Sequence, residues 1–191
     1  MTAFRNSQTA KNLLVSYAFE SQATTRYTFF ANQAGKDGFI QVAAIFRETA
    51  DQECEHALRF FKFFNGGELE VTARFLTGVV KATLDNLVAA ADLEQFVHSD
   101  LYPGFAKIGR QEGFERAADV WDAISVAEVQ HEATFRTLAD NLASGRAFRR
   151  ETDRVWRCIN CGYIHRGSKA PDKCPACVRP ANYFQIFDPA W

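Results

Sequence analysis

Two copies of one short polar pattern constrain this chain more than any other feature. In each copy a single Glu is followed, 33 or 34 residues later, by Glu-x-x-His. Residues at i and i+3 project from one side of a helix, so each copy offers a carboxylate and an imidazole to the same neighbour. The pattern predicts two similar helical hairpins that bring together Glu20, Glu53, His56, Glu94, Glu128 and His131.

The sequence around these residues is itself repeated. The stretch 36–39 (Lys-Asp-Gly-Phe) matches 111–114 (Gln-Glu-Gly-Phe) at a shift of 75, and both Glu-x-x-His motifs share that shift. Glu20 and Glu94 are instead related by a shift of 74. One extra residue therefore lies between Glu94 and Gly113, near Pro103, which is expected to kink the third helix. A local bulge in that helix could absorb the insertion.

Residues 7–144 consist mostly of good helix formers, with apolar positions at three- and four-residue spacing. Glycine-containing breaks predict four helices, at about 7–34, 37–64, 80–111 and 114–144. The link from 66 to 79 is long enough to run the length of a bundle. The expected fold of this region is an all-α, ferritin-like four-helix bundle with a long crossover between helices 2 and 3.

Four carboxylates and two imidazoles can hold two metal ions, as in carboxylate-bridged di-iron and di-manganese bundles. Oxygen-rich ligation with two nitrogens suits iron or manganese. Four carboxylates nearly neutralise two divalent ions, so such a site can be buried. The alternative, that each Glu-x-x-His is only an exposed pair on a helix, is disfavoured because both copies occur in duplicated positions with an upstream Glu.

Beyond residue 150 the composition changes, because four of the five Cys lie there. Cys158-x-x-Cys161 and Cys174-x-x-Cys177 are spaced to close a tetrahedral thiolate site. This spacing does not separate iron from zinc. We expect two domains, 1–150 and 151–191, the second a small β domain stabilised by its metal. Its apolar shell is predicted to comprise Trp156, Tyr163, Tyr183, Phe184 and Phe187.

Charge and hydropathy exclude several classes of protein. With 22 basic and 23 acidic residues, the chain has a net charge of −1, which gives no electrostatic case for nucleic acid or an anionic membrane as partner. No signal peptide and no apolar run of spanning length is recognised, so a cytoplasmic location is expected. In a reducing compartment, five Cys are better interpreted as ligands or thiols than as disulfides. Cys54 is then only a small side chain beside Glu53.

Together these motifs resemble rubrerythrins over essentially the whole chain. The stretches that carry the resemblance include Glu20-Ser-Gln-Ala, 35–39, Phe61-Lys-Phe, Tyr102-Pro, Trp156-Arg-Cys, Cys161-Gly-Tyr and Cys174-Pro-Ala-Cys, beside both Glu-x-x-His motifs. The resemblance implies a ferritin-like di-iron bundle followed by a rubredoxin-like domain with one iron held by four cysteines. It implies reduction of hydrogen peroxide to water, with electrons from rubredoxin or an NAD(P)H-linked reductase passing through the thiolate iron to the di-iron centre.

The resemblance also implies roles for individual residues. The six Glu and His residues would hold the iron pair, and Tyr27 and Tyr102 would hydrogen-bond to its carboxylates. From spacing alone, Tyr27 lies two turns from Glu20 on the same face, and a plain core tyrosine is the alternative. Because the helices are long and the ligands lie near their middle, the tail lies far from its own bundle's site. A head-to-tail homodimer that works between subunits is therefore expected.

One position departs from the rubrerythrin pattern. Rubrerythrins usually carry another Glu one turn after the position of Glu94, and one iron exchanges its His ligand for that Glu on oxidation. Here the residue is Val97, which cannot ligate, and the six-ligand set is closer to that of bacterioferritins. His98 could reach the same region but is more simply a surface residue, as is His165.

Three functions remain open from the sequence. The first is a peroxide reductase in which the tail supplies electrons to the bundle. The second is an O2-using ferroxidase or oxidase of the di-iron carboxylate class, which the symmetric ligand set makes less remote. The third is a metal-binding protein without turnover, with zinc in the four-cysteine site.

Overall fold

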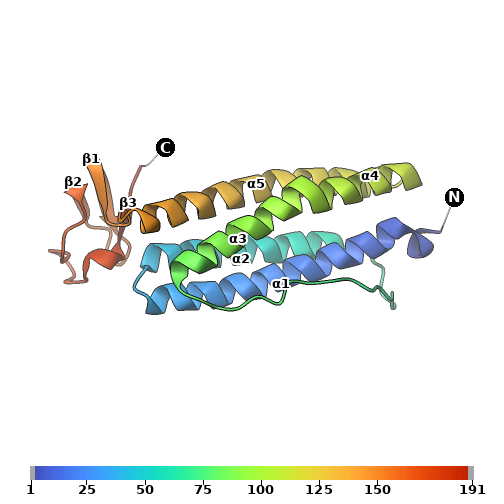
Figure 1. Cartoon of the computed structure of the whole chain (residues 1–191), viewed down its shortest axis with the longest axis horizontal. Coiled ribbons are helices and arrows are strands. Elements are labelled where there is room, and N and C mark those ends of the chain that lie inside the picture. The colour runs from blue at the N-terminus through green and yellow to red at the C-terminus, as the bar shows by residue number, and fades with distance from the viewer. Residues whose placement is uncertain (1–2, 189–191) are drawn as a thin grey trace.

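A computed structural model describes residues 3–188, which form a long helical bundle with a small sheet beyond one end (Figure 1). The helical elements are a short 3-10 turn (Phe4–Asn6), α1 (Gln8–Lys36), α2 (Ile40–Phe61), α3 (Thr83–Phe96), a π-helical turn (Val97–Leu101), α4 (Tyr102–Glu112) and α5 (Glu115–Ala143). The strands are β1 (Arg149–Cys158), β2 (Ile164–Lys169) and β3 (Phe184–Ile186), with a 3-10 turn at Ala181–Tyr183. The predicted ferritin-like bundle is confirmed.

The bundle consists of two hairpins, α1 with α2 and the α3–α4 pair with α5 (Figure 1). Its apolar interior is divided into two clusters. One contains Phe30, Phe46 and Phe135, and the other contains Phe60 and Trp121. On each long helix the predicted polar residues lie between these clusters in sequence. The two apolar clusters therefore bracket a polar layer at the middle of the bundle.

The predicted third helix is divided by the π-helical turn, which confirms the expected bulge. The Tyr102 N–H donates to the Val97 carbonyl, five residues earlier, so this turn holds one residue more than an α-helical turn. Pro103 stands in the first turn of α4, where its missing N–H is tolerated. The insertion revealed by the internal repeat thus lies just before Pro103.

Three predicted helix ends are displaced by about three residues. α2 begins at Ile40 and ends at Phe61, and α3 begins at Thr83. Residues 80–82 stay outside the helix because the Asn86 side chain accepts from the Lys81 N–H and donates to the Lys81 carbonyl. The crossover before Thr83 runs along α1 (Figure 1), where the Arg26 guanidinium donates to the Leu76 carbonyl at 2.5 Å.

Carboxylates at matching positions of the two hairpins cap each other's first helix. Asp37 accepts from the N–H and hydroxyl of Thr83, at 2.9 and 2.6 Å, at the start of α3. Glu112 accepts from the N–H and hydroxyl of Thr9, at 2.7 and 2.6 Å, at the start of α1. Asp37 and Glu112 are the pair related by the 75-residue repeat. The duplication therefore persists in how the halves are joined.

The C-terminal module is a three-stranded antiparallel sheet of order β2-β1-β3. It buries Trp156 and Phe184 together with Cys158 and Cys174. The other four residues of the predicted aromatic shell belong to this core. The Phe187 ring instead lies against Arg157, with 4.5 Å between the guanidinium carbon and the ring centre. β1 begins at Arg149, so a division after residue 150 would fall two residues inside this strand.

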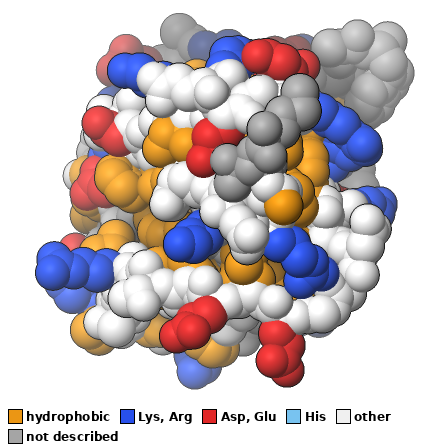
Figure 2. All heavy atoms as spheres, turned by 90° about the vertical axis from the view of Figure 1, so that its right-hand side faces the viewer, with side chains coloured by type: hydrophobic (Ala, Val, Ile, Leu, Met, Phe, Trp, Pro, Cys, Tyr) orange, Lys and Arg blue, Asp and Glu red, His pale blue; other side chains and the backbone are white. Residues whose placement is uncertain are grey.

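The surface at the other end of the bundle carries interspersed acidic and basic side chains (Figure 2). This distribution agrees with the near-zero net charge. Within residues 3–188, none of the helices combines the length and the apolar character that crossing a membrane requires.

Candidate metal centres

The six predicted residues of the bundle converge from four helices into one cluster. Their side chains are buried, apart from the partly accessible His56 ring, which is 16% exposed. Their ligand atoms form two groups, each within 4.8 Å: Glu20, Glu53, His56 and Glu128, and Glu53, Glu94, Glu128 and His131. Because both groups contain Glu53 and Glu128, these two carboxylates can serve both metal positions.

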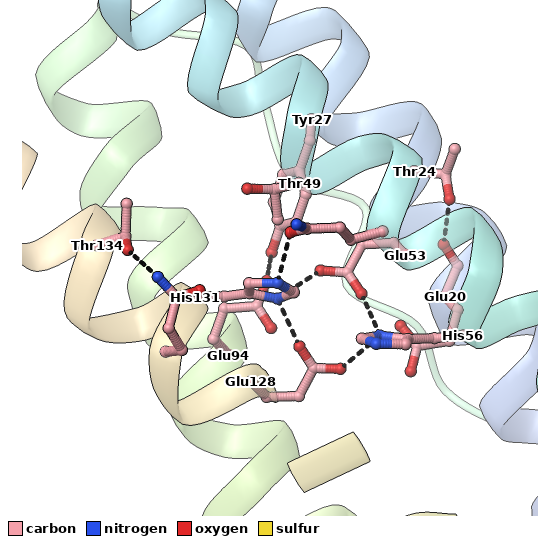
Figure 3. Close-up of polar contacts among 12 residues, drawn as sticks. Glu20, Thr24, Tyr27, Thr49, Glu53, His56, Glu94, Glu128, His131 and Thr134 are labelled. Atoms are coloured by element: carbon pink, nitrogen blue, oxygen red, sulfur yellow. Dashed lines mark hydrogen bonds and ion pairs between the residues drawn. The ribbon is translucent and has the colours of Figure 1, made fainter. Parts of the chain in front are cut away.

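The distances show the same arrangement (Figure 3). Glu53 lies 2.9 Å from His56 Nδ1 through Oε2 and 3.0 Å from His131 Nδ1 through Oε1. Glu128 lies 2.7 Å from His131 Nδ1 through Oε2 and 3.1 Å from His56 Nδ1 through Oε1. Glu53 and Glu128 thus each span the two imidazoles, whereas Glu20 accompanies His56 and Glu94 accompanies His131.

The cluster fits a pair of divalent cations. Glu53 Oε1 and Glu128 Oε1 are buried and accept no hydrogen bond. Each lies about 3 Å from an imidazole nitrogen, but the single Nδ1 proton is donated to the other carboxylate. A buried carboxylate oxygen without a donor is costly, and a cation would satisfy it. Two divalent cations would also balance four carboxylates.

The pKa values of the cluster show which of its groups hold protons. Burial raises the pKa values of Glu20 and Glu94 well above their usual range. Burial alone would lower the pKa values of the imidazoles, but the close contacts of both rings with Glu128 and Glu53 outweigh it and raise them to about 10 for His56 and about 9 for His131. Protons therefore gather where cations would otherwise compensate the carboxylates.

Two tyrosines donate hydrogen bonds into the cluster from opposite hairpins. The Tyr27 hydroxyl donates to Glu94 Oε1, and the Tyr102 hydroxyl donates to Glu20 Oε1. Burial, followed by repulsion from these carboxylates, raises the pKa of both phenols well above the usual value. Both phenols therefore remain donors. The hydrogen bond expected between each tyrosine and a cluster carboxylate is present.

The side chains after Glu94 do not add a seventh donor to the cluster. Val97 is 5% exposed and lies in the apolar cluster of Phe60 and Trp121. The His98 Nε2 atom is 2.7 Å from Glu132 Oε2, so this imidazole pairs with α5. His165 is half-buried in β2 and is less exposed than the sequence suggested.

The four predicted cysteines of the tail form a second candidate centre. Their sulfurs lie within 4.8 Å of one another, with Cys158 Sγ 3.7 Å from Cys177 Sγ and Cys161 Sγ 3.7 Å from Cys174 Sγ. A hydrogen bond from the Arg179 N–H contributes most to lowering the pKa of Cys177, to about 6, which favours the ligating thiolate. Cys161 is exposed and Cys158 is buried. Cys54, also exposed, belongs to neither centre.

Sequence reasoning missed the Gln52 side chain, whose Oε1 lies 3.0 Å from His131 Nε2. Gln52 occupies an exposed position on α2, and its neighbour in space is on α5. No periodicity or motif signals such a contact between helices.

These two centres define a class of protein: a carboxylate-rich di-metal four-helix bundle joined to a four-thiolate module. The family model for rubrerythrin matches residues 11–139, and the model for the rubrerythrin rubredoxin-like domain matches residues 156–185. Over 191 residues, and over the full length of both chains, the sequence is 48% identical to rubrerythrin of Nitratidesulfovibrio vulgaris. The chain belongs to the rubrerythrin family.

Solved structures agree with this assignment. A structure of nigerythrin in a mixed-valence state superposes with a TM-score of 0.64 at 28% identity, covering 95% of this chain and 90% of that one. A bacterioferritin of Desulfovibrio desulfuricans, at 19% identity, gives a TM-score of 0.67 over 74% of this chain and 84% of its own, and it shows the shared fold alone. The protein is a member of an oxidoreductase family with a di-iron site and a rubredoxin-like four-cysteine site.

Proposed function

We propose that this protein reduces hydrogen peroxide to water, with electrons that an external donor delivers through the four-cysteine site. One peroxide molecule takes up two electrons and two protons, its O–O bond breaks, and two water molecules form. The observation that carries the proposal is that one chain holds both a buried six-residue di-metal cluster and a separate four-thiolate site with an exposed cysteine. Storage of iron would need no such second site.

We assign six ligands to the ion pair, with Glu53 and Glu128 shared between both ions, Glu20 and His56 on one, and Glu94 and His131 on the other. A pair of ferrous ions would supply two electrons at one place. The residues of the chain hold and orient this pair. The Tyr27 and Tyr102 hydroxyls fix Glu94 and Glu20, and the surrounding burial limits the access of water.

The ligand assignment can be tested by removing one shared carboxylate. Glu53→Ala should lose metal from the bundle because it removes a donor from both positions, while the four-cysteine site keeps its own. Glu55→Ala, two residues away at an exposed position, serves as the control. Metal analysis of the purified proteins should give two ions fewer per chain for Glu53→Ala than for Glu55→Ala. Full bundle occupancy in Glu53→Ala would contradict the assignment.

The electron route separates the two sites experimentally. Cys158→Ser should abolish donor-driven peroxide turnover, yet a chemically reduced bundle should still consume one peroxide per ion pair without releasing O2. Donor-driven turnover that survives this change would make the four-cysteine site structural and favour zinc there. A visible spectrum with metal analysis of protein from its native host checks this directly, because oxidised iron in four thiolates is red and zinc is colourless.

An O2-using ferroxidase or oxidase is the second candidate, and the apolar Val97 at the end of α3 favours it. Comparing the rates at which the reduced protein is oxidised by peroxide and by O2 distinguishes the two, since the proposed activity requires the peroxide reaction to be the faster. We also propose a cytoplasmic location, which the five unpaired cysteines support.

We further propose a homodimer in which the four-cysteine site of one chain serves the bundle of the other. From Glu128 to the end of α5 at Ala143, the helix rises about 22 Å, and the sheet module lies beyond that end. Electron transfer slows steeply with distance, so a head-to-tail pair would shorten the route.

A further inference from the structure

The two imidazoles of the cluster have different surroundings on the side that faces away from the carboxylates. The Nδ1 atom of His131 faces Glu128 and Glu53, at 2.7 and 3.0 Å. Its Nε2 atom lies 3.0 Å from Gln52 Oε1, across the seam between α5 and α2. Since an amide oxygen only accepts, the Nε2 atom must carry a proton. If a metal ion takes the place of the Nδ1 proton, Nδ1 is the nitrogen that faces the ion.

His56 has no equivalent partner. The 75-residue repeat relates Glu53 to Glu128 and His56 to His131, so the counterpart of Gln52 is Ala127 on α5. A methyl group accepts no hydrogen bond, and within residues 3–188 no side chain or carbonyl bonds to His56 Nε2. The exposed fractions differ accordingly, at 16% for the His56 side chain and 4% for that of His131.

We propose that Gln52 is a positioning residue for His131, and that the absence of such a group at Ala127 makes the two metal positions unequal. The proposal rests on the ligand set assigned above. Gln52 limits rotation of the His131 ring and keeps its Nδ1 lone pair directed at the cluster. Partners of this kind typically change metal affinity by 10- to 100-fold. The position of His131 and Glu94 should therefore bind its ion more tightly than that of His56 and Glu20.

Four variants separate this role from simple packing. Gln52→Leu keeps the size of the side chain but removes the acceptor, whereas Gln52→Glu retains an acceptor. Ala127→Gln supplies His56 with the group it lacks, and Ala127→Leu is its size-matched control. Gln52 is exposed and Ala127 is half-buried, so helical circular dichroism should be preserved in all four.

The first measurement is release of ferrous ions from the fully loaded protein to a chelator under anaerobic conditions, with the four-cysteine iron followed by its own absorption. The bundle ions should leave in two phases. Gln52→Leu should lower the affinity for the more tightly bound ion about tenfold and leave the affinity for the other ion unchanged. Gln52→Glu should retain both affinities, and Ala127→Gln should raise the affinity for the more weakly bound ion.

The second measurement is the proton NMR spectrum of the ferrous protein, in which each ligating imidazole gives a shifted N–H signal. The His131 signal should exchange slowly with water and the His56 signal rapidly. Gln52→Leu should speed the first exchange, and Ala127→Gln, but not Ala127→Leu, should slow the second.

Unchanged affinity and exchange in Gln52→Leu would overturn the proposal, as would an equal loss in Gln52→Glu or equal weakening of both ions. Two bound ions without peroxide reduction would instead overturn the proposed function and leave this inference standing.

Discussion

Val97 shows how a single side chain can limit what a metal site does. It begins the π-helical turn three residues after the cluster residue Glu94 and is buried against apolar neighbours such as Phe60. An ion can move toward a new ligand only where a donor atom stands, and this position offers none.

We therefore expect His56 to remain a ligand in both oxidation states of the iron-loaded protein. Val97→Glu should restore a donor at this position, so crystals of its reduced and oxidised forms should differ in ion position by more than those of the unmodified protein. Peroxide reduction should persist in both proteins because the six assigned ligands are unchanged. An ion displaced from His56 on oxidation of the unmodified protein would contradict this interpretation of Val97.

Each Cys-x-x-Cys motif, with the residue that follows it, forms a tight cysteine knuckle, and in one of the two knuckles that following residue carries backbone strain. Gly162 follows Cys161 with φ 79°, and Val178 follows Cys177 with φ 57°. In both knuckles this residue donates its N–H to the first cysteine, Gly162 to Cys158 and Val178 to Cys174. A β-branched residue is strained at positive φ, whereas glycine is not.

The knuckle glycine and valine should therefore respond unequally to exchange. Gly162→Val should destabilise the metal-loaded module by about 1–2 kcal/mol from strain alone, because a Cβ atom there meets nothing within 4 Å. Val178→Gly should leave the stability of the module unchanged, since relief of the backbone strain offsets the greater entropy of the unfolded chain. Thermal unfolding followed by the absorption of the thiolate-bound metal would check both, and a clear loss of stability in Val178→Gly would refute the argument.

At the scale of elements, the exchange of capping carboxylates joins the two hairpins. Hydrogen bonds from Thr83 contribute most to lowering the pKa of Asp37, and hydrogen bonds from Thr9 contribute most to lowering that of Glu112. A carboxyl group whose pKa is depressed by folding stabilises the fold above its unfolded pKa. That contribution is lost as the pH falls through the folded pKa.

Replacing both carboxylates by Asp37→Asn and Glu112→Gln tests this pH dependence. The double variant should be less stable than the unmodified protein by about 1–2 kcal/mol at pH 7, because each helix start loses a charge-assisted cap. The difference should shrink toward zero below about pH 4, where the native carboxyls become protonated. Denaturant unfolding of both proteins, compared at each pH, measures it. A stability difference that does not change with pH would show that the carboxylate charges do not contribute to stability.

At the scale of the whole molecule, the two centres lie at different places along one long axis. The cluster occupies the middle of the bundle, and the sheet module lies beyond the end of α5 (Figure 1). The stacked rings of Phe39 and Phe148, 6.2 Å apart, connect the bundle to the segment before β1. This geometry underlies the proposal that electrons pass between subunits.

Mixed dimers provide the test. A Cys158→Ser chain and a Glu53→Ala chain should each lack donor-driven turnover alone, for different reasons. Mixed and allowed to exchange subunits, they should regain part of the activity, because one site of the mixed dimer pairs an intact four-cysteine centre with an intact bundle. Absence of recovery despite demonstrated exchange would count against the arrangement.

The ligand residues could be identified from the sequence because metal ligation requires particular side chains at particular spacings. Glu53 and His56 are three apart on one helix, and the duplicated motif marks their counterparts in the second hairpin. Each Cys-x-x-Cys motif likewise lies within a short stretch of sequence. The extra residue before Pro103 was also predicted, because a repeat with an insertion must accommodate it within a helix.

Contacts between helices were decided only by the tertiary structure. Spacing placed Tyr27 on the same face as Glu20, yet its hydroxyl donates to Glu94 on α3. Likewise, no pattern predicted that Gln52 would reach His131 on another helix. Periodicity determines which side of a helix a residue occupies. The rotation and offset of one helix against the next, which decide which groups meet, depend on the packing of the whole core.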